Sequence, residues 1–117
     1  MEKEKIEKIP RKRIEVDVNK IKKIEDHFTH REITEINSGI EWYDFVFPVD
    51  LVNCETKVFV SIAERKGECD TTEHPSLRRS SIWNVAPYQG GISVLIWLGD
   101  TDRSVEGQID ILGFTSG

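Results

Sequence analysis

The hydrophobic residues between Gly90 and Asp100 fall on both faces of an extended strand. One face carries only aliphatic side chains, and the other carries a leucine and a tryptophan: Ile92, Val94, Ile96 and Leu98 against Leu95 and Trp97. A strand of this type belongs in the middle of a sheet, with cover on both faces. Turn residues flank it at 87–91 and 99–102, so we expect Trp83 and Val105 to lie on its antiparallel neighbours.

Alternation of apolar and polar residues predicts further strands along the chain. The pattern is found in residues 13–18, 42–49, 57–62, 80–85 and 105–114. In the first of these, Ile14 and Val16 alternate with charged residues, and in the last, Ile109 and Ile111 do the same. Each segment is therefore expected to bury one face and expose the other.

Helical spacing appears only in the first third of the chain. Asn19 is a good N-cap, and Ile21, Ile24 and Phe28 follow at intervals of three and four, which predicts a short helix over 20–28. Residues 29–40 fit two structures: Thr29 and Glu32 match a helix capping box, yet 31–36 also alternate like an edge strand.

The pattern predicts a mainly β fold, an antiparallel sandwich or flattened barrel of about six to eight strands with one or two short N-terminal helices. The alternative is an α+β fold, with an antiparallel sheet and a helix on one face. Residues 1–12 are expected to form a charged, flexible N-terminal segment, and residues 13–117 a single globular domain.

The composition of the chain narrows the range of partners and compartments to be expected. The 117 residues carry a formal net charge of −5, which argues against nucleic acid as a partner. The N-terminus lacks the apolar stretch of a signal peptide, and no segment approaches the roughly 20 apolar residues of a membrane span. We therefore expect a cytoplasmic protein with no membrane partner, in which Cys54 and Cys69 are ordinary thiols.

Catalysis and metal binding are not favoured by the sequence. Cys69 and His74 would be the best nucleophile and base, but no oxyanion donor accompanies them. The acidic run from Asp100 to Glu106 lacks the glycine and the final glutamate of a calcium loop, and no cysteine and histidine set has zinc spacing. We expect no catalytic residue, no metal and no cofactor.

Two groups of residues are candidates for ligand binding. The long polar loop at 64–79 contains His74, Arg78 and Arg79, and paired guanidinium groups suit a carboxylate or phosphate. Trp83 and Tyr88 flank the turn at 87–91 and are expected to be partly exposed, where aromatic rings contact sugars or proteins.

These features favour a non-catalytic β module that binds a partner or self-associates as a homo-oligomer. A viral or phage-type structural or accessory protein fits this description by analogy of fold alone. One alternative is a protein that binds a nucleotide or other small anion through the 64–79 loop. Another is a carbohydrate-binding sandwich that uses its exposed aromatic residues.

Overall fold

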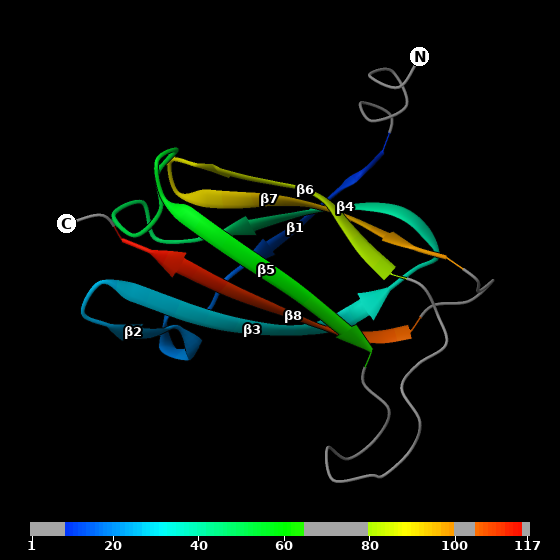
Figure 1. Cartoon of the computed structure of the whole chain (residues 1–117), viewed down its shortest axis with the longest axis horizontal. Helices are drawn as coiled ribbons and strands as arrows, with labels where there is room; N and C mark the ends of the chain where they lie inside the picture. Colours follow the sequence, from blue (N-terminus) through cyan, green and yellow to red (C-terminus); the bar gives the residue numbers. More distant parts are fainter. Residues whose placement is uncertain (1–8, 65–79, 100–104, 116–117) are drawn as a thin grey trace, which may run out of the picture.

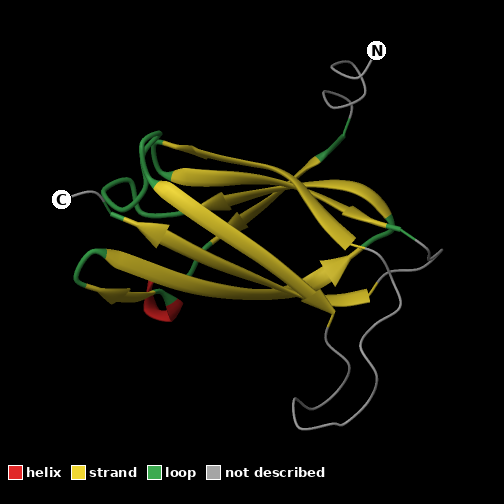
Figure 2. Cartoon of the chain, in the orientation of Figure 1, coloured by secondary structure: helices red, strands yellow, loops and turns green. Residues whose placement is uncertain are grey.

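A computed structural model describes residues 9–64, 80–99 and 105–115. The described residues form eight strands: β1 (Arg11–Glu15), β2 (Lys22–Ile24), β3 (His27–Ile36), β4 (Gly39–Val46), β5 (Lys57–Glu64), β6 (Ser80–Tyr88), β7 (Gly91–Leu98) and β8 (Val105–Phe114). Figures 1 and 2 show them as two layers of twisted strands. The predicted mainly β sandwich is therefore confirmed. No helix within the described ranges has the length and apolar character needed to cross a membrane.

Each layer is a four-stranded sheet. Sheet A has the order β1-β4-β7-β6, and sheet B has the order β2-β3-β8-β5. Neighbouring strands run antiparallel in both sheets, except that β1 pairs in parallel with β4. Because the chain passes from β1 in sheet A to β2 in sheet B, its first two strands lie in different layers.

The core lies between the two sheets. Alternate residues of both sheets turn inward and are buried there, among them Tyr43, Phe45, Ile92, Val94 and Ile96 from sheet A and Phe28, Ile36, Ile109 and Ile111 from sheet B. This is the alternation that the sequence predicts for 42–49 and 105–114. Burial of these side chains is the main favourable contribution to folding.

Strand β7 holds the central position predicted from its hydrophobic pattern. It pairs with β4 on one side and with β6, which carries Trp83, on the other. The expectation that Val105 lies on a neighbouring strand is wrong, because β8 pairs with β3 and β5 in the opposite sheet. Alternation shows which face of a strand is buried but does not identify the strands beside it.

The helix predicted over 20–28 is also wrong. Only a 3-10 turn, Val18–Lys20, forms in this region, and Asp17 caps it by accepting a hydrogen bond from the Asn19 amide. A hairpin of β2 and β3 follows, with Glu25 in the left-handed region at its turn (φ 48°). A short isolated helix is marginal, whereas β3 gains a ten-residue ladder with β8. The same ladder determines the structure of residues 29–36, which form a strand and not a helix.

Candidate functional site

All three tryptophans of the chain lie on the outer face of sheet A. Trp42 and Trp97 alternate with the buried residues Tyr43 and Ile96, so their side chains point away from the core. Trp83 belongs to the neighbouring strand β6. Together with Tyr88 these residues form what we call the aromatic face: Trp42, Trp83, Tyr88 and Trp97.

Trp83 reaches this face through an irregularity in β6. The pairing with β7 shifts between Ile82 and Asn84, so Trp83 is an extra residue with no partner of its own in the β6–β7 ladder. Its indole N–H donates to Ser81 Oγ at 3.0 Å, and 55% of the residue is exposed. Bulges of this kind re-aim a side chain out of a regular sheet, often beside a functional site.

Two glycines allow the aromatic rings to lie against the sheet. A Cβ atom on Gly91 would overlap the ring of Tyr88, and a Cβ on Gly99 would overlap the ring of Trp97. The rings therefore occupy the space that a side chain at these positions would fill. Leu95, which also points outward, is only 9% exposed. The rings of Tyr88 and Trp97 therefore lie over the backbone of the sheet instead of projecting from it.

Hydrogen bonds fix the position of two of these rings. The Tyr88 hydroxyl donates to the Asp44 carboxylate, and the Trp42 indole N–H donates to Ser93 Oγ at 2.5 Å. Burial raises the pKa of Tyr88 to about 12, together with its hydrogen bond to Asp44. The guanidinium of Arg11 lies 4.1 Å from the centre of the Trp42 ring, within the range of a cation–π interaction.

The charges on this face balance. Outward positions on β1 and β4 carry Arg11, Arg13, Glu15 and Asp44, which sum to zero. Arg13 and Glu15 form an exposed ion pair at 3.7 Å. The outward positions of β7 and of β6 from Ser81 onward carry no charged residue. An aromatic surface of this composition suits an uncharged ligand.

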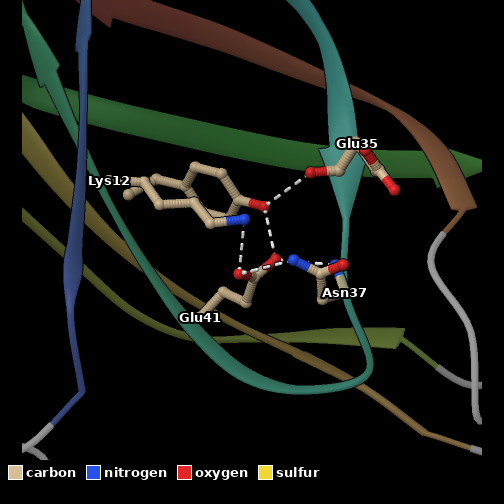
Figure 3. A network of polar contacts seen from close by, with 5 residues as sticks. Lys12, Glu35, Asn37 and Glu41 are labelled. Carbon is tan, nitrogen blue, oxygen red and sulfur yellow. Dashed lines mark hydrogen bonds and ion pairs between the residues drawn. The ribbon is translucent and has the colours of Figure 1, made fainter.

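Strand β1 is held in place by a polar network on its inner side (Figure 3). Lys12 forms an ion pair with Glu41 at 2.6 Å, and Glu41 also accepts hydrogen bonds from the Tyr43 hydroxyl at 2.8 Å and the Asn37 amide at 2.7 Å. Because Lys12 points inward, its neighbours Arg11 and Arg13 are directed to the aromatic face.

The network determines the charge state of its members. Burial tends to raise the pKa of Glu41, but the hydrogen bonds from Lys12, Asn37 and Tyr43 outweigh it and hold this pKa below its ordinary value. Burial and the hydrogen bond to Glu41 raise the pKa of Tyr43. Glu41 is thus an ionised, paired carboxylate that orients β1 against β4.

The structure places Trp83 and Tyr88, two of the residues singled out in the sequence, on the outer face of sheet A, five residues apart on β6. The other three, His74, Arg78 and Arg79, lie outside the described residues, so the anion site expected in the 64–79 loop stays a prediction. Sequence reasoning missed Trp42 and Trp97. Their alternation with Tyr43 and Ile96 was the available signal, because it places them opposite the core.

Metal-ligating residues and cysteines are scattered in the part of the chain that is described. There, no three His, Cys, Asp or Glu side chains gather closely enough to hold a metal ion. Cys54 is an exposed free thiol, and Cys69 is not described.

Fold and surface together define the class of protein, a two-sheet β sandwich with an aromatic outer face. No protein-family model matches the chain, and neither a curated protein nor a solved structure matches it significantly.

Proposed function

We propose that the protein is a non-catalytic binding module and that its aromatic face binds an uncharged carbohydrate. The observation that carries this proposal is the collection of Trp42, Trp83, Trp97 and Tyr88 on one outer face whose charges sum to zero. Such a concentration of large aromatic side chains on a partly exposed sheet surface is typical of contact with a ligand or partner.

Sugar rings suit this surface for a physical reason. The face of an aromatic ring carries partial negative charge, and the C–H groups of a pyranose present the positive end of weak dipoles to it. The rim offers partners for hydroxyl groups, since Asn84 is exposed beside Trp83 and Arg13 lies beside Asp44. A phosphate-rich polymer is less well matched, because the chain carries a net charge of −5.

Binding can be tested with tryptophan fluorescence and a panel of neutral oligosaccharides. We expect quenching or a spectral shift with at least one glycan, and a loss of affinity of about tenfold or more in Trp83→Ala. Phe59→Ala is the matched control, because Phe59 is an equally exposed aromatic residue (61%) on the outer face of sheet B. Equal affinities in Trp83→Ala and the wild type, or no response to any glycan, would contradict the proposal.

Self-association is a second candidate function, and the edges of the sheets favour it. Strand β5 pairs with β8 on one side only and spans eight residues, so its other edge has no strand partner among the described residues. Unpaired backbone groups of this kind accept a strand from another molecule. Sedimentation at micromolar concentration should then show a dimer or larger species, and a monomer would exclude this candidate.

A further inference from the structure

The outer face of sheet B contains a hollow of about 580 Å³. Its floor follows the strand register. Lys22, Thr29, Leu112 and Phe59 lie in one row across β2, β3, β8 and β5, and Arg31, Asp110 and Ser61 lie in the next row. Adjacent strands are about 4.8 Å apart, so the first row spans roughly 14 Å. The hollow is large enough for a small organic molecule.

One end of the hollow is positively charged. Lys20 on the 3-10 turn and Lys22 on β2 line it, as do Arg31 and Asp110, whose side chains pair at 2.8 Å. Three cations against one anion give a local charge of +2 in a chain whose formal net charge is −5. A concave site of one sign concentrates ligands of the opposite sign.

The other end is apolar. Phe59 is 61% exposed and lies opposite Leu112 in the β5–β8 pairing. Its ring meets the ring of Phe114 edge to face, with centroids 6.1 Å apart. Thr29, opposite Lys22, and Ser61, on the same strand as Phe59, supply hydroxyl groups at the floor. The arrangement places cations and an aromatic wall at opposite ends of one row.

We propose that this hollow binds a small amphipathic anion, with a carboxylate or phosphate head at Lys20 and Lys22 and an apolar tail against Phe59 and Leu112. The site is separate from the aromatic face, since it lies on the other sheet of the sandwich. Failure of carbohydrate binding would therefore leave this inference untouched, and the reverse also holds.

The test uses octanoate and hexyl phosphate as probes. Their binding is measured through the amide chemical shifts in NMR spectra of the full chain. We expect saturable shifts at Thr29, Ser61 and Leu112, and much weaker binding of octanol, which lacks the charge. The relative affinities of octanoate and hexyl phosphate distinguish a carboxylate from a phosphate ligand. Absence of binding by both probes would overturn the proposal.

Two variants separate the role of the lysines from that of net charge. Lys20→Gln combined with Lys22→Gln should weaken the binding of the better probe by about tenfold or more. Lys23→Gln is the control, because Lys23 pairs with the inward-facing Phe28 and does not line the hollow. Equal affinity in the double variant and the wild type would show that the lysines do not bind the head group. If inorganic phosphate bound as tightly as hexyl phosphate, the apolar tail would add nothing to the affinity. The proposed contact of the tail with Phe59 and Leu112 would then be refuted.

Discussion

The hydroxyl group of Tyr88 donates a hydrogen bond to the carboxylate of Asp44 across the central strand β7. Tyr88 ends β6 and Asp44 belongs to β4, so a single side chain connects both neighbours of β7 on the outer face. Because this hydrogen bond also raises the pKa of Tyr88, titration of Tyr88 can report whether the ring is in this position.

Titration of tyrosine absorbance should report this contact. The chain has two tyrosines, and the pKa of each is raised above the ordinary value of 10.0. We expect no phenolate absorbance from the folded protein near pH 10, and ionisation of Tyr88 at about pH 12. In Asp44→Asn the pKa of Tyr88 should fall toward 10.0, because the charge of the acceptor is lost.

The same shift has a consequence for stability. A tyrosine whose pKa is higher in the folded state contributes its full stabilisation below the unfolded value of 10.0 and loses it as the pH rises toward 12. Asp44→Asn should therefore lower the free energy of unfolding at neutral pH and flatten its decline between about pH 10 and pH 12. Identical titration curves in the two proteins would contradict the hydrogen bond.

A methyl group at Gly91 should displace the ring of Tyr88. The Cβ atom of Gly91→Ala would overlap this ring, which can move because it is partly exposed (38%). We expect a change in stability of about 1 kcal/mol or less, a fall in the Tyr88 pKa and weaker glycan binding. Tyr88→Phe is the matched control, because it removes the hydroxyl and keeps the ring. If the Tyr88 pKa is unchanged in Gly91→Ala, the ring does not lie over this glycine.

Glu41 should make the protein sensitive to acid. Its pKa is held below the ordinary value of 4.5, so its stabilisation is complete above that pH and is lost as the pH falls through the lower folded value. Glu41→Gln should lower the free energy of unfolding by about 1–3 kcal/mol at neutral pH and flatten its decline in acid. Urea denaturation at about pH 7 and pH 3 measures both effects.

Glu15→Gln is the control for Glu41→Gln. Glu15 lies on β1 as a mostly exposed carboxylate, and its ion pair with Arg13 spans 3.7 Å. Exposed pairs of this kind contribute little, so its denaturation curves should match those of the wild type at both pH values. A similar loss in both variants would show that the inner network does not secure β1.

Two phenylalanines should differ sharply in their contribution to stability. Phe45 is completely buried between the sheets, and Phe59 is 61% exposed. We expect Phe45→Ala to cost about 3–5 kcal/mol and Phe59→Ala to change stability by no more than about 0.5 kcal/mol. Thermal or chemical denaturation provides the comparison. Equal losses would mean that the core is not formed between these two sheets.

The sequence predicted the class of fold and the central position of β7 because these depend on local periodicity. A strand apolar on both faces, such as 91–98, fits the interior of a sheet better than its edge. Only one of its faces is covered by the second sheet, because Trp97 lies on the outer face of sheet A. The sequence could not assign β8 to its sheet, because the inward face of Ile109 and Ile111 is compatible with several partners. The helix over 20–28 failed for a related reason: pairing of β3 with β8, over a long separation in sequence, outweighs local spacing.

The candidate site, like the fold, could be predicted only where it depends on residues close together in the sequence. The sequence predicts exposure of Trp83 from a turn at 87–91, but β6 continues to Tyr88 and Trp83 lies within the strand. Its exposure comes with its extra position in the β6–β7 pairing, which is visible only in the register. The hollow on sheet B could not be found from sequence, because its floor is assembled from four strands. Lys22 and Phe59 become members of one row only when β3 and β8 lie between them.

The parallel pairing of β1 with β4 has a consequence for the order of folding. Arg11 pairs with Trp42, so β1 gains its partner only after the chain has continued through β2 and β3 to β4. It is also a five-residue strand at the border of its sheet, and its amide hydrogens should exchange with solvent earlier than those of β7. Strand β1 therefore covers the backbone edge of β4, which would otherwise be open to pairing with a strand of another chain.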